Sequence, residues 1–201
     1  MKLYYAPGAC SLSPHIALRE AGVNFSAIKV DLAEKKTETG EDFYAVNPKG
    51  QVPTLVTDQG EVITEGPVIL QYLAETHPAA GLAPTDNGAG RRRYLEWLNF
   101  ATSDMHKGVG ALFNKQLPDE AKAVMKAGLA RKFAYLDQHL AKNAFATGER
   151  FTAVDGYLFT ILRWTVPLQV DLAPYANIRA YMDRVGARPK VQEALAAEGI
   201  K

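Results

Sequence analysis

The chain has one cysteine, Cys10, and its thiol is the side chain best suited to nucleophilic or redox chemistry. Cys10 lies just before a segment with helical spacing, and a thiol close to a helix N-terminus has a lowered pKa that favours the reactive thiolate. A lone cysteine is also commonly a small buried apolar residue, and this alternative stays open. Ser11 and Ser13 are neighbouring hydroxyls, and Ser11 is a second candidate nucleophile.

His106, in the second half of the chain, is the candidate for proton transfer. A histidine can donate or accept a proton near neutral pH. On a regular helix, Asn99, Ser103 and His106 share one face through i, i+4 and i, i+7 spacing, and Lys107 follows directly. The alternative is that His106 caps a helix end or lies at the surface. We expect structural or surface roles for the other histidines, which are His15, His77 and His139. No H-x-x-x-H pair, cysteine cluster or carboxylate cluster predicts a metal site.

The elements that must position Cys10 alternate between strand and helix in the first part of the chain. We expect a strand at 2–5, a helix at 13–21, a strand at 27–32, a hairpin at 52–56 and 61–64, and a helix from 68 to just before Pro78. The β-α-β order predicts a parallel strand pair with a right-handed crossover. The whole order is that of a thioredoxin-like domain, which we place at residues 1–80.

The rest of the chain shows helical spacing and no convincing strand. Residues 77–90 are rich in Pro, Gly, Asp and Asn, which marks a domain boundary. We expect helices around residues 94–105, 129–140, 153–168, 175–187 and 189–197. The fold class is therefore α/β plus all-α: a thioredoxin-like domain followed by an all-helical domain at residues 88–201.

Composition excludes several classes of function. The net charge of +1 gives no field that would favour nucleic acid or an anionic membrane. The only basic run, residues 91–93, is typical of a solvated helix face. No stretch approaches the ~18 apolar residues that cross a bilayer. The start reaches Pro7 before any apolar run long enough for a signal peptide, so we expect a cytoplasmic protein.

Residues 47–55 read NPKGQVPTL and resemble the NPxGxVPxL signature of the glutathione transferases, here of the bacterial, beta-like type. The resemblance implies a cis peptide bond before Pro53. It also implies that the N–H and C=O of Val52 pair with the cysteinyl backbone of glutathione, as an added strand would. The alternative is an ordinary turn before a strand.

Residues 64–69 (TEGPVI) resemble the family segment E-S-x-A-I at the start of a helix. In the family, the carboxylate at the position of Glu65 holds the γ-glutamyl ammonium of glutathione, and the first helix amides bind its α-carboxylate. The usual serine is Gly66 here, so a hydroxyl is missing and weaker binding of glutathione is expected. Glu65 as a solvated first-turn acid is the alternative.

The resemblance also implies roles for other residues. Cys10 and His106 lie around the glutathione sulfur, and Lys35 pairs with the glycyl carboxylate, unless it is simply a solvated loop lysine. The remaining glutathione contacts that the resemblance implies are Gln51, Val52, Pro53, Gly66, Asn99, Ser103, Asp104, Met105 and Lys107. Separately, Thr152 and Asp155 match the family's S/T-x-x-D capping box, a structural motif.

The expected activity is conjugation of glutathione to small hydrophobic electrophiles in detoxification, with glutathione as co-substrate, no other cofactor, and a homodimeric enzyme. Two alternatives remain. The pattern C-x-x-S at residues 10–13 resembles a single-thiol glutaredoxin, so Cys10 could form a mixed disulfide with glutathione and support thiol-disulfide exchange or reductive dehalogenation. The departure at Gly66 leaves open a non-enzymatic binding protein on the same fold.

Overall fold

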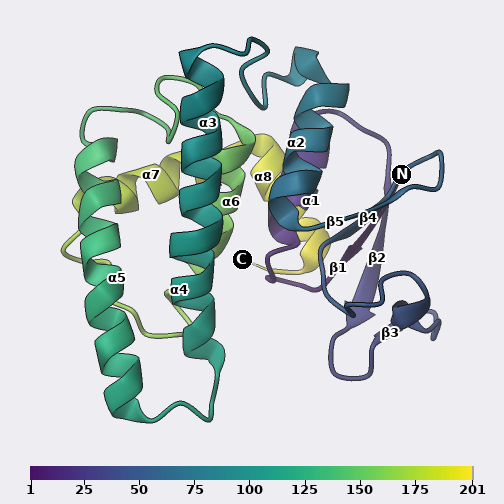
Figure 1. The fold of residues 1–201 in the computed structure, drawn as a ribbon, viewed down its shortest axis with the longest axis horizontal. Coiled ribbons are helices and arrows are strands. Elements are labelled where there is room, and N and C mark those ends of the chain that lie inside the picture. The colour runs from purple at the N-terminus through teal and green to yellow at the C-terminus, as the bar shows by residue number, and fades with distance from the viewer. Residues whose placement is uncertain (201) are drawn as a thin grey trace. The chain divides into compact units, whose positions relative to one another are not determined.

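The computed structural model describes residues 1–200, which divide into two compact units (Figure 1). The first unit comprises Met1–Ala83 together with the C-terminal segment from Arg188, and the second is Pro84–Ala187. The break at residue 83 lies inside the predicted boundary. Assigning everything from residue 88 to the helical domain was wrong at the C-terminus, because the last helix packs on the first helix of the thioredoxin-like unit.

The first unit contains a five-stranded sheet in the order β3-β2-β1-β4-β5. Its strands are β1 (Lys2–Tyr5), β2 (Ser26–Asp31), β3 (Lys36–Thr37), β4 (Thr54–Val56) and β5 (Val62–Thr64). β1 and β2 are parallel, whereas β1–β4 and β4–β5 are antiparallel. This confirms the predicted β-α-β unit and hairpin. The sequence did not predict β3, since two residues are too short to show an alternating pattern.

Three helices belong to this unit: α1 (Leu12–Glu20), α2 (Gly66–Thr76) and α8 (Pro189–Glu198). α1 is buried along most of its length. α8 begins with Pro189, whose fixed φ suits a first helical turn, and ends at Gly199 in the left-handed conformation (φ 68°). Figure 1 shows α8, in yellow, beside α1, in purple. Residues far apart in sequence therefore meet on one side of the sheet.

The second unit is helical. Its helices are α3 (Ala89–Asn99), a π-helical segment (Phe100–His106), α4 (Lys107–Gly110), α5 (Asp119–Leu140), α6 (Ala153–Arg163) and α7 (Ala176–Gly186). α6 is buried from Ala153 to Leu162 and forms the centre of this unit. It ends five residues before the predicted 168. Short 3-10 turns lie at Phe43–Ala45, Pro78–Ala80 and Ala111–Phe113.

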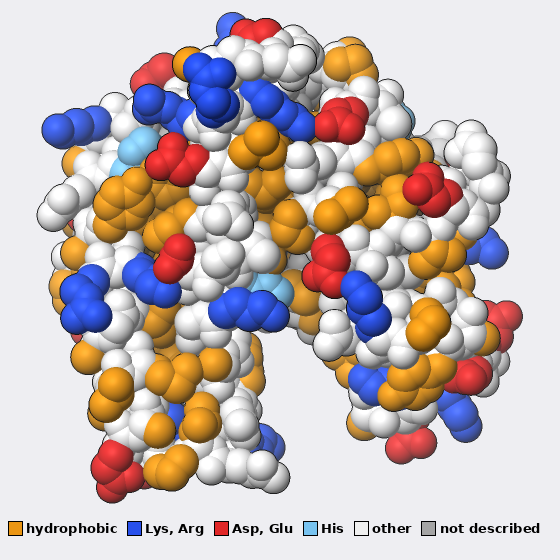
Figure 2. All heavy atoms as spheres, viewed as in Figure 1, with side chains coloured by type: hydrophobic (Ala, Val, Ile, Leu, Met, Phe, Trp, Pro, Cys, Tyr) orange, Lys and Arg blue, Asp and Glu red, His pale blue; other side chains and the backbone are white. Residues whose placement is uncertain are grey.

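The surface of the second unit carries charges of both signs. Figure 2 shows Lys and Arg side chains over the start of α3, with acidic side chains close by. Arg92 and Arg93 in this helix are exposed, as expected for a solvated helix face. No helix within residues 1–200 combines the length and the apolar character that crossing a membrane requires.

Candidate active site

Cys10 lies on the turn that joins β1 to α1, where its side chain is partly exposed. Its Sγ is 3.2 Å from the carbonyl oxygen of Val52, to which the thiol donates a hydrogen bond. The turn itself is closed by the N–H of Ala9, which donates to the carbonyl of Ala6 at 3.0 Å. The fold thus brings Cys10 against the backbone of the NPKGQVPTL segment, 42 residues further along the chain.

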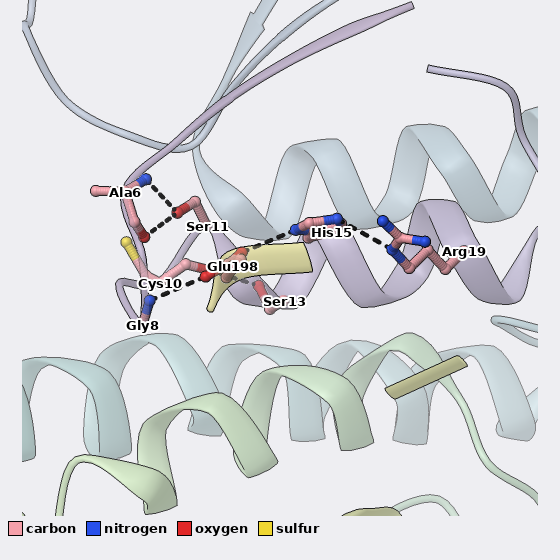
Figure 3. Close-up of polar contacts among 8 residues, drawn as sticks. All are labelled: Ala6, Gly8, Cys10, Ser11, Ser13, His15, Arg19 and Glu198. Carbon is pink, nitrogen blue, oxygen red and sulfur yellow. Dashed lines mark hydrogen bonds and ion pairs between the residues drawn. The ribbon is translucent and has the colours of Figure 1, made fainter. Parts of the chain in front are cut away.

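The hydroxyl of Ser11 is not placed for catalysis. Ser11 is fully buried, and its Oγ accepts from the N–H of Ala6 at 3.1 Å and donates to the carbonyl of Ala6 at 3.2 Å (Figure 3). Both bonds brace the end of β1. The candidate nucleophile role for Ser11 is therefore wrong, because the hydroxyl is occupied and out of reach of a ligand.

The peptide bond between Val52 and Pro53 is cis, as the resemblance implies. Asn47 holds this turn: its Nδ2 donates to the carbonyl of Gln51 at 2.8 Å and to the Oγ1 of Thr54 at 2.9 Å. The side chain of Gln51 is exposed. Asn47 is buried and supports the site, a role that the sequence motif alone did not indicate.

Glu65 precedes α2 with a positive φ of 69°, which few residues other than glycine adopt. Such conformations cost energy and concentrate at ligand-binding positions. The exposed carboxylate of Glu65 is 2.6 Å from the Nζ of Lys49. Pro67 has no N–H, and the N–H of Val68 already donates to the carbonyl of Glu65 at 3.0 Å. Gly66 therefore carries the first-turn amide best placed to bind an anion.

Lys35 also has a positive φ, 54°, and lies just before β3. Its Nζ donates to the carbonyl of Gly50 at 2.9 Å, one residue before Gln51. This contact ties the Lys35 loop to the turn that carries the cis bond. It places an ammonium group close to that turn, where a carboxylate of a bound ligand would be attracted.

In the helical unit, the candidate residues around His106 lie on or beside the π-helix, a rare form that is common at functional sites. Ser103 Oγ is 3.2 Å from Asn99 Oδ1, so these two do share a face. The wider π turn removes the regular i, i+7 relation that predicted His106 on the same face. Instead, His106 Nδ1 is 2.6 Å from the hydroxyl of Tyr157 on α6. No sequence pattern indicated Tyr157.

The other predicted contacts on this segment differ in exposure. Met105 is fully buried, so its side chain belongs to the core of the helical unit and is not available to a ligand. This expectation was wrong. Asp104 pairs with Lys132 on α5, with 2.8 Å between Oδ1 and Nζ. Lys107 is exposed.

Aromatic rings surround His106. The ring of Trp164 lies edge-on to it, with 5.0 Å between the ring centroids, and the ring of Phe113 lies 5.7 Å from that of Trp164. Phe113 is 47% exposed, so part of this apolar cluster is accessible. Residues 1–200 contain no group of three His, Cys, Asp or Glu side chains that could hold a metal ion.

The predicted capping box is present at the start of α6. Asp155 Oδ2 accepts from the N–H of Thr152 at 2.8 Å, and Oδ1 accepts from the N–H of Ala146 at 2.8 Å and the hydroxyl of Tyr181 at 2.9 Å. Burial raises the pKa of Asp155 to about 6, despite these donors. The motif holds α6, the central helix of this unit, in place.

Comparisons with known proteins identify the family. The family models "Glutathione S-transferase, N-terminal domain" and "Glutathione S-transferase, C-terminal domain" match residues 8–76 and 119–184. Glutathione S-transferase GstA of Escherichia coli O157:H7 is 46% identical, and the match covers 100% of both chains.

Solved structures extend this likeness. A sphingomonad glutathione S-transferase complexed with glutathione has a TM-score of 0.95 at 47% identity, and the match covers 100% of both chains. A bacterial beta-class glutathione S-transferase of Sphingomonas chungbukensis has a TM-score of 0.95 at 45% identity, again over 100% of both chains. The protein belongs to the glutathione S-transferase family and is of the bacterial, beta-like type.

Proposed function

We propose that the protein is a glutathione transferase that conjugates the thiolate of glutathione to small hydrophobic electrophiles. One observation carries the proposal: Cys10 Sγ lies 3.2 Å from the carbonyl of Val52. Val52 is the residue whose backbone would pair with the cysteinyl unit of glutathione. Glutathione bound there would have its sulfur beside Cys10. The solved relative that carries glutathione supports this choice of ligand.

The two ends of the tripeptide would bind to separate charged groups. The γ-glutamyl ammonium would take the place that the Lys49 ammonium now occupies, 2.6 Å from Glu65. Its α-carboxylate would accept from the Gly66 amide at the start of α2, where helix N-termini favour anions. The glycyl carboxylate would pair with Lys35, whose Nζ is 2.9 Å from the Gly50 carbonyl.

The reaction requires the glutathione thiol to lose its proton. A free thiol of this kind has a pKa of ~8.5, so little is ionised at neutral pH. Fixed donors and proximity to the electrophile lower the barrier to reaction. We assign these donors to Cys10 and to His106, whose ring is held by Tyr157 at 2.6 Å. Asn99, Ser103 and Lys107 would supply the remaining polar contacts.

The electrophile would bind the aromatic cluster of the helical unit. Trp164 packs on His106, and Phe113, which packs on Trp164, offers the exposed apolar surface of this cluster. Flat or unsaturated hydrophobic molecules fit such rings well, since aromatic contacts add to simple burial. A role in detoxification, and the cytoplasmic location expected from the sequence, remain predictions.

We also infer a homodimer. Each unit exposes large apolar side chains, among them Tyr44 at 48% and Val62 at 47% in the first and Tyr135 at 51% in the second. Apolar groups left exposed on a single chain are candidates for burial between two copies. Light scattering after size-exclusion chromatography would show twice the mass of one chain. A single-chain mass at working concentration would contradict this inference.

Glutathione-dependent conjugation of chlorodinitrobenzene, followed by absorbance, tests the activity. We expect a clear rate above the no-enzyme control. The Cys10→Ala variant then separates two roles: loss of conjugation assigns Cys10 to thiolate stabilisation, whereas loss of disulfide exchange alone assigns it to redox work. No conjugation despite glutathione binding would overturn the proposal in favour of mixed-disulfide chemistry. No glutathione binding at all would point to a non-enzymatic protein.

A further inference from the structure

Glu198, the last residue of α8, contacts the turn that carries Cys10. Its Oε2 accepts from the N–H of Gly8 at 2.9 Å, across 190 residues of sequence (Figure 3). Its Oε1 is 2.8 Å from the Nδ1 of His15 on α1. The side chains of Glu198 and His15 are both 0% exposed. A carboxylate is thus buried at the base of the thiol turn, and the proposed conjugation chemistry makes no use of it.

The direction of each hydrogen bond in this network follows from Arg19. The Nε of Arg19 carries a hydrogen and donates to the Nε2 of His15 at 3.1 Å. His15 Nε2 is therefore the acceptor, and the ring proton on Nδ1 is donated to Glu198. The Nη1 of Arg19 also lies 3.6 Å from the Oε2 of Glu193 on α8. The result is a chain of hydrogen bonds that links the guanidinium of Arg19, the imidazole of His15, the carboxylate of Glu198 and the amide of Gly8.

A buried network of this kind is costly unless every member has a partner. Here each oxygen of Glu198 accepts a hydrogen bond, and both nitrogens of His15 are engaged. The rings of Tyr5 and Phe25 pack against His15, at 5.7 Å and 5.4 Å between centroids. Satisfied and enclosed, the network fixes one arrangement of α8 against the turn.

The Glu198 contact restrains a flexible position of the turn. Gly8, two residues before Cys10, has φ 70°, and glycine adopts this region and others about equally readily, so a bond to its amide limits its freedom. Side-chain contacts that fasten the turn include Ser11 to Ala6, Cys10 to Val52, and Glu198 to Gly8. The first two come from neighbouring parts of the thioredoxin-like fold, whereas the third comes from the C-terminal helix.

We propose that Glu198 is a positioning residue for Cys10, acting through the Gly8 amide, with His15 holding the carboxylate in place. The C-terminal helix thereby sets where the thiol lies relative to Val52. Only the role of the Cys10 thiol beside glutathione rests on the proposed function. The positioning itself is testable without glutathione.

The chain offers a matched control. Glu20 on α1 holds the start of α8 through two hydrogen bonds from Arg188, at 2.7 Å and 2.8 Å. Glu198→Gln and Glu20→Gln each remove one carboxylate that fastens α8 to α1. The first disturbs the Gly8 contact and the second leaves it intact, so a general loosening of α8 affects both alike.

The test measures alkylation of Cys10 by iodoacetamide in the folded protein, by mass spectrometry, which is unambiguous because the chain has one cysteine. We expect Glu198→Gln to raise the rate about threefold or more, since small displacements of a reacting group change rates strongly. The alkylation rate of Glu20→Gln should stay within about twofold of the wild-type rate, so that the two variants can be told apart. Amide exchange of Gly8, followed by NMR, should accelerate in Glu198→Gln alone.

Equal alkylation rates in the three proteins, or equal increases in both variants, would overturn the proposal. If Glu198→Gln does not fold, Arg19→Gln tests the same network from its partly exposed end. That variant should raise Cys10 alkylation in the same direction by a smaller factor, and an unchanged rate would again overturn the proposal. Because the assay contains no glutathione, its failure is distinct from a failure of the conjugation assay.

Discussion

The two units hold their candidate site residues in different ways. In the thioredoxin-like unit the binding groups are set by the backbone: the cis bond before Pro53 and the positive φ of Glu65 and of Lys35. In the helical unit, His106 is held by another side chain, the hydroxyl of Tyr157 at 2.6 Å, on a segment of π-helix. The first unit therefore presents groups suited to binding the tripeptide, and the second presents a side chain suited to proton transfer.

This difference teaches where substitutions should act. Backbone-defined binding groups should control the affinity for glutathione, because their charges and amides meet fixed parts of the ligand. A side chain held by another side chain should control turnover, because its orientation decides how well it serves the reaction. Substitutions in each unit can test this division, and the largest effect is expected at the buried capping box of α6 within the helical unit.

The largest effect is expected for Asp155→Ala. The change leaves the N–H of Ala146 and both the N–H and the hydroxyl of Thr152 without the carboxylate acceptor. The hydroxyl of Tyr181 loses its 2.9 Å acceptor and keeps the backbone carbonyl of residue 155, at 3.3 Å. Each buried donor left unsatisfied costs ~1–3 kcal/mol, and we expect a loss of at least ~3 kcal/mol in unfolding free energy. Denaturant unfolding measures it. A loss below ~1 kcal/mol would show that the helical unit does not depend on this carboxylate.

The pH dependence of stability has a definite sign at Asp155. Its pKa of about 6 in the folded protein lies above its ordinary value of 3.8, so the folded state binds the proton more tightly than the unfolded state. The contribution of this group to stability is therefore lost as pH rises from about 4 to about 6. The amide side chain that Asp155→Asn introduces does not titrate. The free energy of unfolding of the wild type, minus that of this variant, should therefore be larger at about pH 4 than at about pH 6. The same difference in unfolding free energy at both pH values would contradict this prediction.

Next in size is the affinity for glutathione in Glu65→Gln. A hydrogen bond between charged groups contributes ~1.5–3 kcal/mol, so we expect Kd to rise by about 10- to 100-fold. Calorimetric titration with glutathione measures it, and kcat at saturating glutathione should change little. A fall in kcat with unchanged Kd would break the division between the two units.

Tyr157→Phe tests the opposite half of the comparison. Removing the hydroxyl takes away one hydrogen bond that orients the His106 ring. We expect kcat for conjugation to fall about tenfold, a fraction of what proton transfer by a side chain contributes. The Kd of glutathione should stay within about twofold, a change too small to reflect a lost hydrogen bond to a charged group. Weaker glutathione binding with unchanged kcat would assign Tyr157 to the binding of the tripeptide.

The smallest effect is expected for Lys49→Met, the other member of the Glu65 ion pair. The pair is exposed, so its loss should change the unfolding free energy by less than ~1 kcal/mol. Without Lys49 competing for Glu65, glutathione should bind up to about threefold more tightly, the scale of an exposed ion pair. Weaker binding in this variant would instead show that Lys49 itself contacts glutathione.

Much of the first unit could be predicted from the sequence because its signals are local. The β-α-β order, the hairpin and the turn before Pro53 each come from residues close together in the chain. The exceptions also have local causes: β3 is too short to show a pattern, and the buried hydroxyl of Ser11 resembles an exposed one in sequence.

The helical unit was less predictable. Its helices could be located from their spacing, and so could the capping box at Thr152. The π-helix could not, because hydrophobic spacing does not distinguish it from an α-helix over seven residues. Consequently the prediction that His106 and Asn99 share one helix face, which assumed a regular α-helix, was wrong. The sequence also did not show that Met105 is buried, so the residue was expected to contact a ligand.

The sequence by itself determined the family resemblance, the two-part architecture and the turn beside Val52, because these depend on short motifs and local periodicity. The tertiary structure alone decided which residues meet across long separations. His106 meets Tyr157 over 51 residues, and Gly8 meets Glu198 over 190. No local pattern encodes such pairs, since they arise only when buried helices pack and every buried polar atom must find a partner.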